Sequence, residues 1–162
     1  MKIAYFDCYA GAGGDMIVAA MLDAGVEANW LIEQIDSVRI DGLKIEIAET
    51  LRCGMRGITF RPVAPDQKHH RNLTDILALV AASGISETAK QRVNAVFTAL
   101  AKAEAHVHGK EPDQIHFHEV GAVDSIVDIV AACVAIEALG VDQIVCSVIS
   151  VGGGNFTCRH ER

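Results

Sequence analysis

The sequence predicts an α/β domain in which a small mixed β-sheet is covered by helices. Three observations favour this class. The chain opens on a short apolar run that ends at Asp7, the segment 43–63 alternates apolar and charged residues, and most of the remaining length shows helical spacing of apolar residues. This order of elements suits two packed layers, and a ferredoxin-like sandwich is one way to realise it.

The first half of the chain predicts a strand, then two helices, then a β-hairpin. A Gly/Ala-rich turn follows the apolar strand Lys2–Phe6, and Asp15 suits the cap of the first helix. Alternation then indicates a half-buried strand with a return strand after a glycine-containing turn. The expected elements are a helix at 15–25, a helix at 28–35, a strand at 43–51, a turn at 54–57 and a strand at 58–63.

The second half is predicted to be mostly helical. Asn72 or Thr74 suits the cap of a short helix, and Ser86 suits the cap of a long helix that Gly109 terminates. A nearly all-apolar stretch then predicts a buried helix, followed by a last strand. The expected elements are a helix at 73–82, a helix at 86–108 with an inward stripe at Val93, Phe97, Leu100, Glu104 and His108, a helix from 122 to about 139, and a strand at 143–151.

Length and composition favour one domain and exclude several classes. The 162 residues suit a single α/β domain at 1–151, with a His-rich polar loop near 65–72 and a Gly-rich tail at 152–162 that leads into a missing C-terminal domain. The formal charge of -7 and the 5% aromatic content argue against a nucleic-acid binder.

The same composition argues against secretion and membrane insertion. Asp7 interrupts the opening apolar run too early for a signal peptide, and the longest apolar stretch, 126–139, is too short to span a bilayer. The 5 cysteines include no Cys-x-x-Cys pair. They are typical of reduced thiols, mostly buried, in a cytoplasmic protein.

The strongest candidate site is a His-Phe-His-Glu-Val run that leads into the apolar helix. In an extended segment His116 and His118 point the same way while Phe117 points oppositely. On the helix, Asp124 and Asp128 fall four apart on one face, where buried carboxylates need a cation or a donor. Taken singly, the histidines suit ordinary surface positions and Asp124 suits a helix cap. Together, the candidate metal-ligating and acid–base residues are His116, His118, Glu119, Asp124 and Asp128.

Two further groups offer metal-binding or anion-binding side chains. Glu104 and His108 lie on the predicted inward stripe, where they either join the same site or form a structural pair. In the polar loop, His70 can bind a metal and Arg71 can pair with a phosphate or a carboxylate. Ordinary solvated loop residues are the alternative there.

A glycine-rich turn between the first strand and helix is a third candidate site. Backbone amides at such a turn can hold a phosphate, and Gly11 and Gly14 allow a ligand to approach closely. The turn is neither a P-loop nor a dinucleotide fingerprint. Asp7 and Asp15 flank it, which favours a phosphate bridged by a metal, and a plain tight turn is the alternative.

These segments together resemble the LarC family of nickel-insertion proteins, which complete the nickel-pincer nucleotide cofactor. The most specific matching stretch is His116–Ile129, and others are Phe6–Met16, His70–Ile76 and Ala103–His108. The resemblance covers the whole chain but only the N-terminal portion of a full-length family member. It therefore implies a C-terminal portion of the same protein as a partner.

The resemblance implies a CTP-dependent cyclometallase of the lyase class. Such an enzyme inserts Ni(II) into pyridinium-3,5-bisthiocarboxylic acid mononucleotide, and its CTP, with Mg²⁺ or Mn²⁺, is bound by the C-terminal portion. A nickel carrier without catalysis of its own and a metal-dependent phosphohydrolase are alternatives, and a homo-oligomer is left open. We expect the metal ligands among His70, Glu104, His108, His116 and His118, the acid–base groups at Glu119, Asp124 and Asp128, and the cofactor-binding residues at Asp7, Gly11, Gly14, Asp15 and Arg71.

Overall fold

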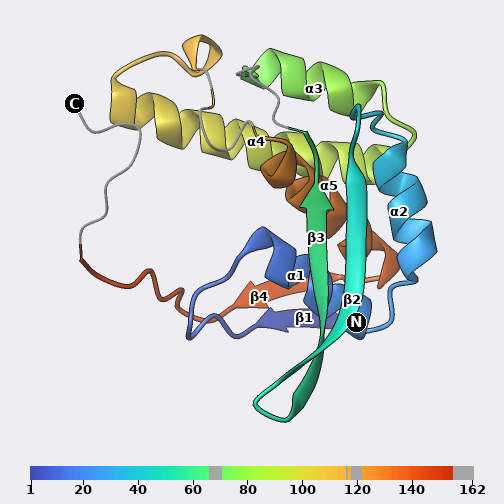
Figure 1. Ribbon diagram of the computed structural model, residues 1–162. Coiled ribbons are helices and arrows are strands. Elements are labelled where there is room, and N and C mark those ends of the chain that lie inside the picture. Colours follow the sequence, from blue (N-terminus) through green and yellow to red (C-terminus); the bar gives the residue numbers. More distant parts are fainter. Residues whose placement is uncertain (66–70, 116, 118–121, 155–162) are drawn as a thin grey trace.

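The computed structural model in Figure 1 describes residues 1–65, 71–115, 117 and 122–154. It confirms the α/β class and the order of elements that the sequence predicts. In chain order these are β1 (Ile3–Phe6), α1 (Gly14–Asp23), α2 (Ala28–Asp36), β2 (Lys44–Arg52), β3 (Met55–Val63), α3 (Leu73–Ala81), α4 (Glu87–His108), the short 3-10 helix η1 (Pro112–Gln114), α5 (Val123–Ala138) and β4 (Gln143–Cys146).

The described strands form two separate two-stranded sheets instead of the single mixed sheet that we expected. Strand β1 pairs with β4 in parallel, with Tyr5 opposite Val145, and β2 pairs with β3 as an antiparallel hairpin. A ferredoxin-like sandwich is therefore wrong, since its first and last strands run antiparallel. The physical reason is that α1 packs against both β3 and α5, so the hairpin lies on α1 and not beside β1 (Figure 1).

Helix α5 is the centre of the core, as its apolar sequence predicts. It packs against α1, α2, α4 and β3, and Ile126 and Val127 are fully buried. A helix surrounded in this way needs apolar side chains on nearly every face. Asp128 is the half-buried carboxylate on this helix, which makes its surroundings informative.

Local signals set most element boundaries. Asn72 caps α3 in a reciprocal capping box with Asp75, the Ser86 side chain accepts a hydrogen bond from the α4 backbone, and Gly109 ends α4 in the left-handed conformation. The hairpin turn is tighter than expected, because Cys53 and Gly54 both have positive φ and form a two-residue turn.

Two boundaries differ from expectation. Gly13 and not Asp15 occupies the cap position of α1, so the Asp15 side chain lies in the first turn and is exposed. The last strand ends at Cys146 and not at 151.

Cys8 and Cys133 are buried as expected, whereas Cys53 and Cys146 are exposed, and all four are free thiols. Over the described ranges, no helix is long and apolar enough to cross a membrane.

Candidate functional site

The first turn of α1 meets α5 where Gly14 faces Asp128. A Cβ built on Gly14 would lie 2.7 Å from the Asp128 Cβ and 2.8 Å from its Oδ2 atom. Contacts this short do not occur, so a side chain at position 14 would force the two helices apart. The sequence assigned Gly14 to a phosphate-binding turn and Asp128 to a metal cluster. The fold brings these two candidate sites together.

The surroundings of Asp128 disfavour its negative charge. Burial is the largest cause of a rise in the pKa of Asp128 to about 6; the nearby carboxylates of Asp15 and Asp124 contribute to this rise, and a hydrogen bond from the backbone N–H of Asp15 opposes it. The Oδ1 atom is buried and has no hydrogen-bond partner among the described residues. Three carboxylates thus share one region, where a proton or a cation would relieve their repulsion.

Two helix N-termini explain why the fold tolerates these carboxylates. The caps of α1 and α5, Gly13 and Ala122, provide no side-chain hydrogen bond to the first turn. Asp15 and Asp124 each lie in a first turn, where the helix dipole favours negative charge. Asp124 Oδ1 also accepts a hydrogen bond of 2.8 Å from the backbone N–H of Ser125. The helix ends therefore stabilise carboxylates that repel one another.

Phe117 fixes the middle of the His-Phe-His run to the core. Its side chain is buried, and its ring meets that of Phe97 on α4 edge-on, with centroids 6.3 Å apart. Its backbone N–H donates to the carbonyl oxygen of Arg71 at 3.2 Å. The Phe117 side chain therefore points into the core, and Arg71 lies beside Phe117. The remaining predicted residues of these two segments, His70, His116, His118 and Glu119, lie outside the described residues.

Glu104 and His108 form an ion-pair contact on α4, with His108 Nε2 3.4 Å from Glu104 Oε1. Neither side chain is buried, so the predicted inward stripe is wrong at Glu104 and His108, although Leu100 packs against the core as predicted. The buried stripe continues through Ala101 and Ala105, one position further along the helix. Small apolar residues can be buried there at no electrostatic cost, whereas a carboxylate and an imidazole stay at the border with solvent.

The glycine-rich turn is held by the segment that follows β4. The Cys8 carbonyl accepts hydrogen bonds from the backbone N–H groups of Gly11, at 3.0 Å, and Ser150, at 3.3 Å. Gly11 has a φ of +84°, and a Cβ there would lie 3.3 Å from the Ser150 carbonyl oxygen. Asp7 is exposed at the start of this turn. A structural reason for Gly11 is therefore present whether or not the turn binds a ligand.

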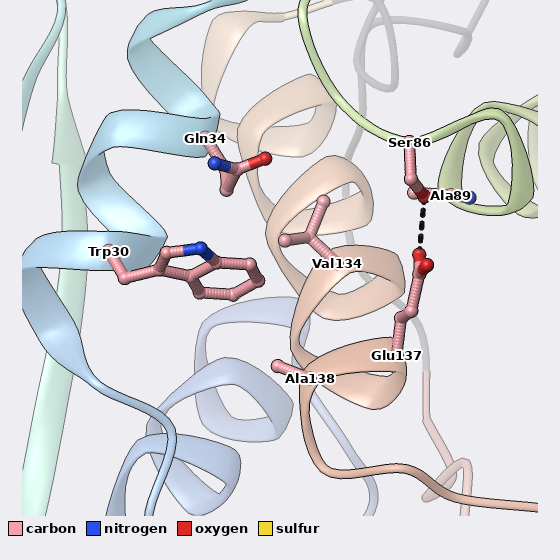
Figure 2. Close-up of a pocket in the computed structure, with 7 residues that line it drawn as sticks. All are labelled: Trp30, Gln34, Ser86, Ala89, Val134, Glu137 and Ala138. Atoms are coloured by element: carbon pink, nitrogen blue, oxygen red, sulfur yellow. Dashed lines mark hydrogen bonds between the residues drawn. The ribbon is translucent and has the colours of Figure 1, made fainter.

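The part of the chain that the structure describes holds no group of three His, Cys, Asp or Glu side chains that could bind a metal ion. A small cavity of about 110 Å³ lies between α2, α4 and α5, apart from all predicted site residues (Figure 2). It is lined by Trp30, Gln34 and Val134, and by Glu137, whose carboxylate accepts a hydrogen bond of 2.5 Å from Ser86. Ligand pockets usually exceed roughly 300 Å³, so a mononucleotide does not fit there.

The fold and this geometry define a small α/β domain in which Asp15, Asp124 and Asp128 lie near one another at the N-terminal parts of two helices. A family model described as nickel insertion protein matches residues 4–162. The chain belongs to the nickel insertion protein family, and the resemblance stated above is confirmed.

Individual relatives agree with the family assignment. Proteins named pyridinium-3,5-bisthiocarboxylic acid mononucleotide nickel insertion protein are similar to almost the whole chain. The protein from Desulfitobacterium hafniense is 40% identical over 160 residues, covering 99% of this chain and 40% of the relative. That from Geobacillus kaustophilus is 38% identical over 170 residues, covering 99% and 41%. The chain thus spans about 40% of the length of these relatives. No solved structure matches it.

Proposed function

We propose that this chain handles Ni(II) as part of an enzyme that inserts the metal into pyridinium-3,5-bisthiocarboxylic acid mononucleotide, which makes the nickel-pincer nucleotide cofactor. The names of the relatives support the reaction. The observation that carries the proposal for this chain is the convergence of Asp15 and Asp124 on Asp128, whose buried Oδ1 has no described hydrogen-bond partner. Such a site favours a positively charged substrate.

Nickel is the substrate that this acidic region would accept. Nitrogen and oxygen ligands hold Ni(II) but exchange more readily than thiolates, so the ion can be surrendered to the sulfur atoms of the precursor. We place His116 and His118 among the ligands, because the buried Phe117 between them ties this segment to α4. His108 and its partner Glu104, together with His70, are further proposed ligands.

Formation of the carbon–nickel bond requires a base. As the ring carbon binds nickel, its proton must leave, and an acceptor with a pKa near the working pH removes it best. The pKa of Asp128 is raised to about 6 by burial and by its acidic neighbours, which fits this role. We propose Asp128 as the proton acceptor, with Asp124 and Glu119 as the other acid–base groups. Formation of the nickel–sulfur bonds, in contrast, removes no proton from the ring.

We propose that the glycine-rich turn and Arg71 hold the phosphate of the precursor. Gly11 and Gly14 let a ligand approach the backbone, and the first turn of α1 offers N–H groups that have no side-chain cap. Asp7 and Asp15 would repel a bare phosphate, so the guanidinium of Arg71 or a bridging cation has to compensate for them.

CTP does not fit the described residues. The cavity of about 110 Å³ is too small for a nucleotide, and the glycine-rich turn is flanked by carboxylates. Since the chain spans about 40% of the length of its relatives, we propose that CTP, with Mg²⁺ or Mn²⁺, is bound by a C-terminal portion that completes this lyase. This division also favours a second candidate function, in which the chain by itself is a nickel carrier. The free cysteines agree with a cytoplasmic location.

Proton release during nickel binding tests the proposal. At pH 6 the Asp128 carboxyl is about half protonated, and a nearby Ni(II) ion would expel roughly half a proton. Calorimetric titration with Ni(II) in buffers of different ionisation enthalpy counts the protons released. We expect Asp128→Asn to lower this count by about that amount, whereas Asp36→Asn, at an exposed position on α2, leaves it unchanged. Equal proton release by the wild-type chain and Asp128→Asn would contradict nickel binding beside Asp128.

A further inference from the structure

The parallel pair of β1 and β4 exposes an apolar face. Side chains alternate between the two faces of a strand, and Phe6 packs against the core. Ile3 and Tyr5 are on the opposite face of β1 and therefore point away from the core. Val145 lies opposite Tyr5 in the parallel register and extends the same surface. The exposed fractions are 47% for Ile3, 62% for Tyr5 and 36% for Val145. We define these three residues as the outer face of β1 and β4.

A parallel sheet normally has both faces covered. Two parallel strands bury too little apolar surface to persist alone, and a contiguous exposed apolar patch often marks an interaction site. The described residues cover the opposite face only in part, since Phe6 packs against the core whereas Ile144 is 50% exposed. The two-stranded sheet lies at the end of the molecule opposite α3 and α4 (Figure 1). Val148 and Val151, which follow β4, are both 91% exposed and continue the apolar character of this region.

The length of the relatives indicates what covers this face. The chain accounts for about 40% of the length of the Desulfitobacterium hafniense protein and 41% of that of the Geobacillus kaustophilus protein. More than half of such a protein must therefore be placed against or beside this domain. A face of Ile, Tyr and Val is complementary to an apolar layer, since permanent interfaces are more apolar than transient ones.

We propose that the outer face of β1 and β4 is the docking surface for the part of the polypeptide that the relatives possess beyond this chain, which covers it with an apolar layer. Strand β1 is followed by the glycine-rich turn that leads to Gly14, and Gly14 lies against Asp128. This proposal goes beyond the proposed function and needs no nickel.

Hydroxyl-radical footprinting with mass spectrometry tests this docking surface. The 162-residue chain is compared with a polypeptide in which it is continued by the remaining length of the Desulfitobacterium hafniense relative. In the longer protein we expect oxidation of Tyr5 to fall at least about fivefold, because the core of an interface excludes water. Leu51, which is 71% exposed at the hairpin tip, is the control and should keep its reactivity.

A matched pair of substitutions provides the second measurement. Tyr5→Lys should leave the melting temperature of the 162-residue chain almost unchanged, because Tyr5 is mostly exposed there, but lower that of the longer protein. Leu51→Lys should lower neither. Equal oxidation of Tyr5 in both proteins would overturn the proposal. So would protection of Tyr5 that appears in the 162-residue chain with rising concentration, since a second copy would then occupy the face.

Discussion

Gly14 lies directly against Asp128, and a Cβ at position 14 would come within 2.7 Å of the Asp128 Cβ atom. This contact sets how closely α1 approaches α5. It also holds the first turn of α1 beside a half-buried carboxylate, to which the backbone N–H of Asp15 donates a hydrogen bond. The acidic site therefore depends on the absence of a side chain at one position.

We expect Gly14→Ala to destabilise the protein by about 1–3 kcal/mol, because the methyl group must displace α1 from α5. Urea unfolding measures this change. Gly57→Ala is the control, since a Cβ there would meet only the Thr50 Cγ2 atom at 4.0 Å. Equal stability of Gly14→Ala and the wild-type protein would contradict the contact. Because the substitution also moves the surroundings of Asp128, we expect it to weaken nickel binding and precursor binding together.

Asp128→Asn should stabilise the protein at neutral pH. The pKa of Asp128 is raised from 3.8 to about 6 in the folded state, so the folded protein binds the proton more tightly than the unfolded chain does. Stability is therefore lost as the pH rises from about 4 to about 6, and the penalty persists above that range. We expect Asp128→Asn to gain roughly 1–3 kcal/mol at pH 8 and almost nothing at pH 3.5.

Urea unfolding of both proteins across this pH range measures the effect. Asp36→Asn, on the exposed surface of α2, is the matched control and should follow the wild-type curve. A loss of stability in Asp128→Asn at pH 8 would show that the carboxylate has a stabilising partner and that its charge is not disfavoured.

Phe117→Ala should cost about 3–5 kcal/mol of stability, because it removes a buried ring that packs edge-on against Phe97. Phe117→Leu retains most of the buried volume and should cost less. Since Phe117 ties the histidine run to α4, we also expect Phe117→Ala to weaken Ni(II) binding, as measured by calorimetry below the unfolding transition. Unchanged nickel affinity in a folded Phe117→Ala protein would separate this segment from the metal site.

The double substitution His116→Ala/His118→Ala should lower the affinity for Ni(II) at least about tenfold, or roughly 1.4 kcal/mol, for each imidazole ligand that is lost. His106→Ala, at an exposed position on α4, is the control. Calorimetric titration measures both. If the double variant binds nickel as tightly as the wild-type protein, the two histidines are not ligands.

The sequence alone determined the α/β class, the core role of α5 and most helix boundaries. These features follow from short-range chemistry: Ser86 and Asn72 satisfy backbone N–H groups at helix starts, Gly109 adopts positive φ at a helix end, and apolar residues all around α5 require burial. The family resemblance also followed from contiguous residues, because the run from His116 to Ile129 is recognised in the sequence without knowledge of the fold.

Only the tertiary structure decided which candidate residues meet. Gly14 and Asp128 are more than a hundred positions apart, and their contact depends on how α1 packs between β3 and α5. The same packing separated the strands into two sheets, which no local pattern indicated. The raised pKa of Asp128 likewise arises chiefly from burial and from the charge of Asp15 on another helix. Local patterns fix hydrogen bonds and periodicity within one element, whereas electrostatics and close approach are set by elements that become neighbours only on folding.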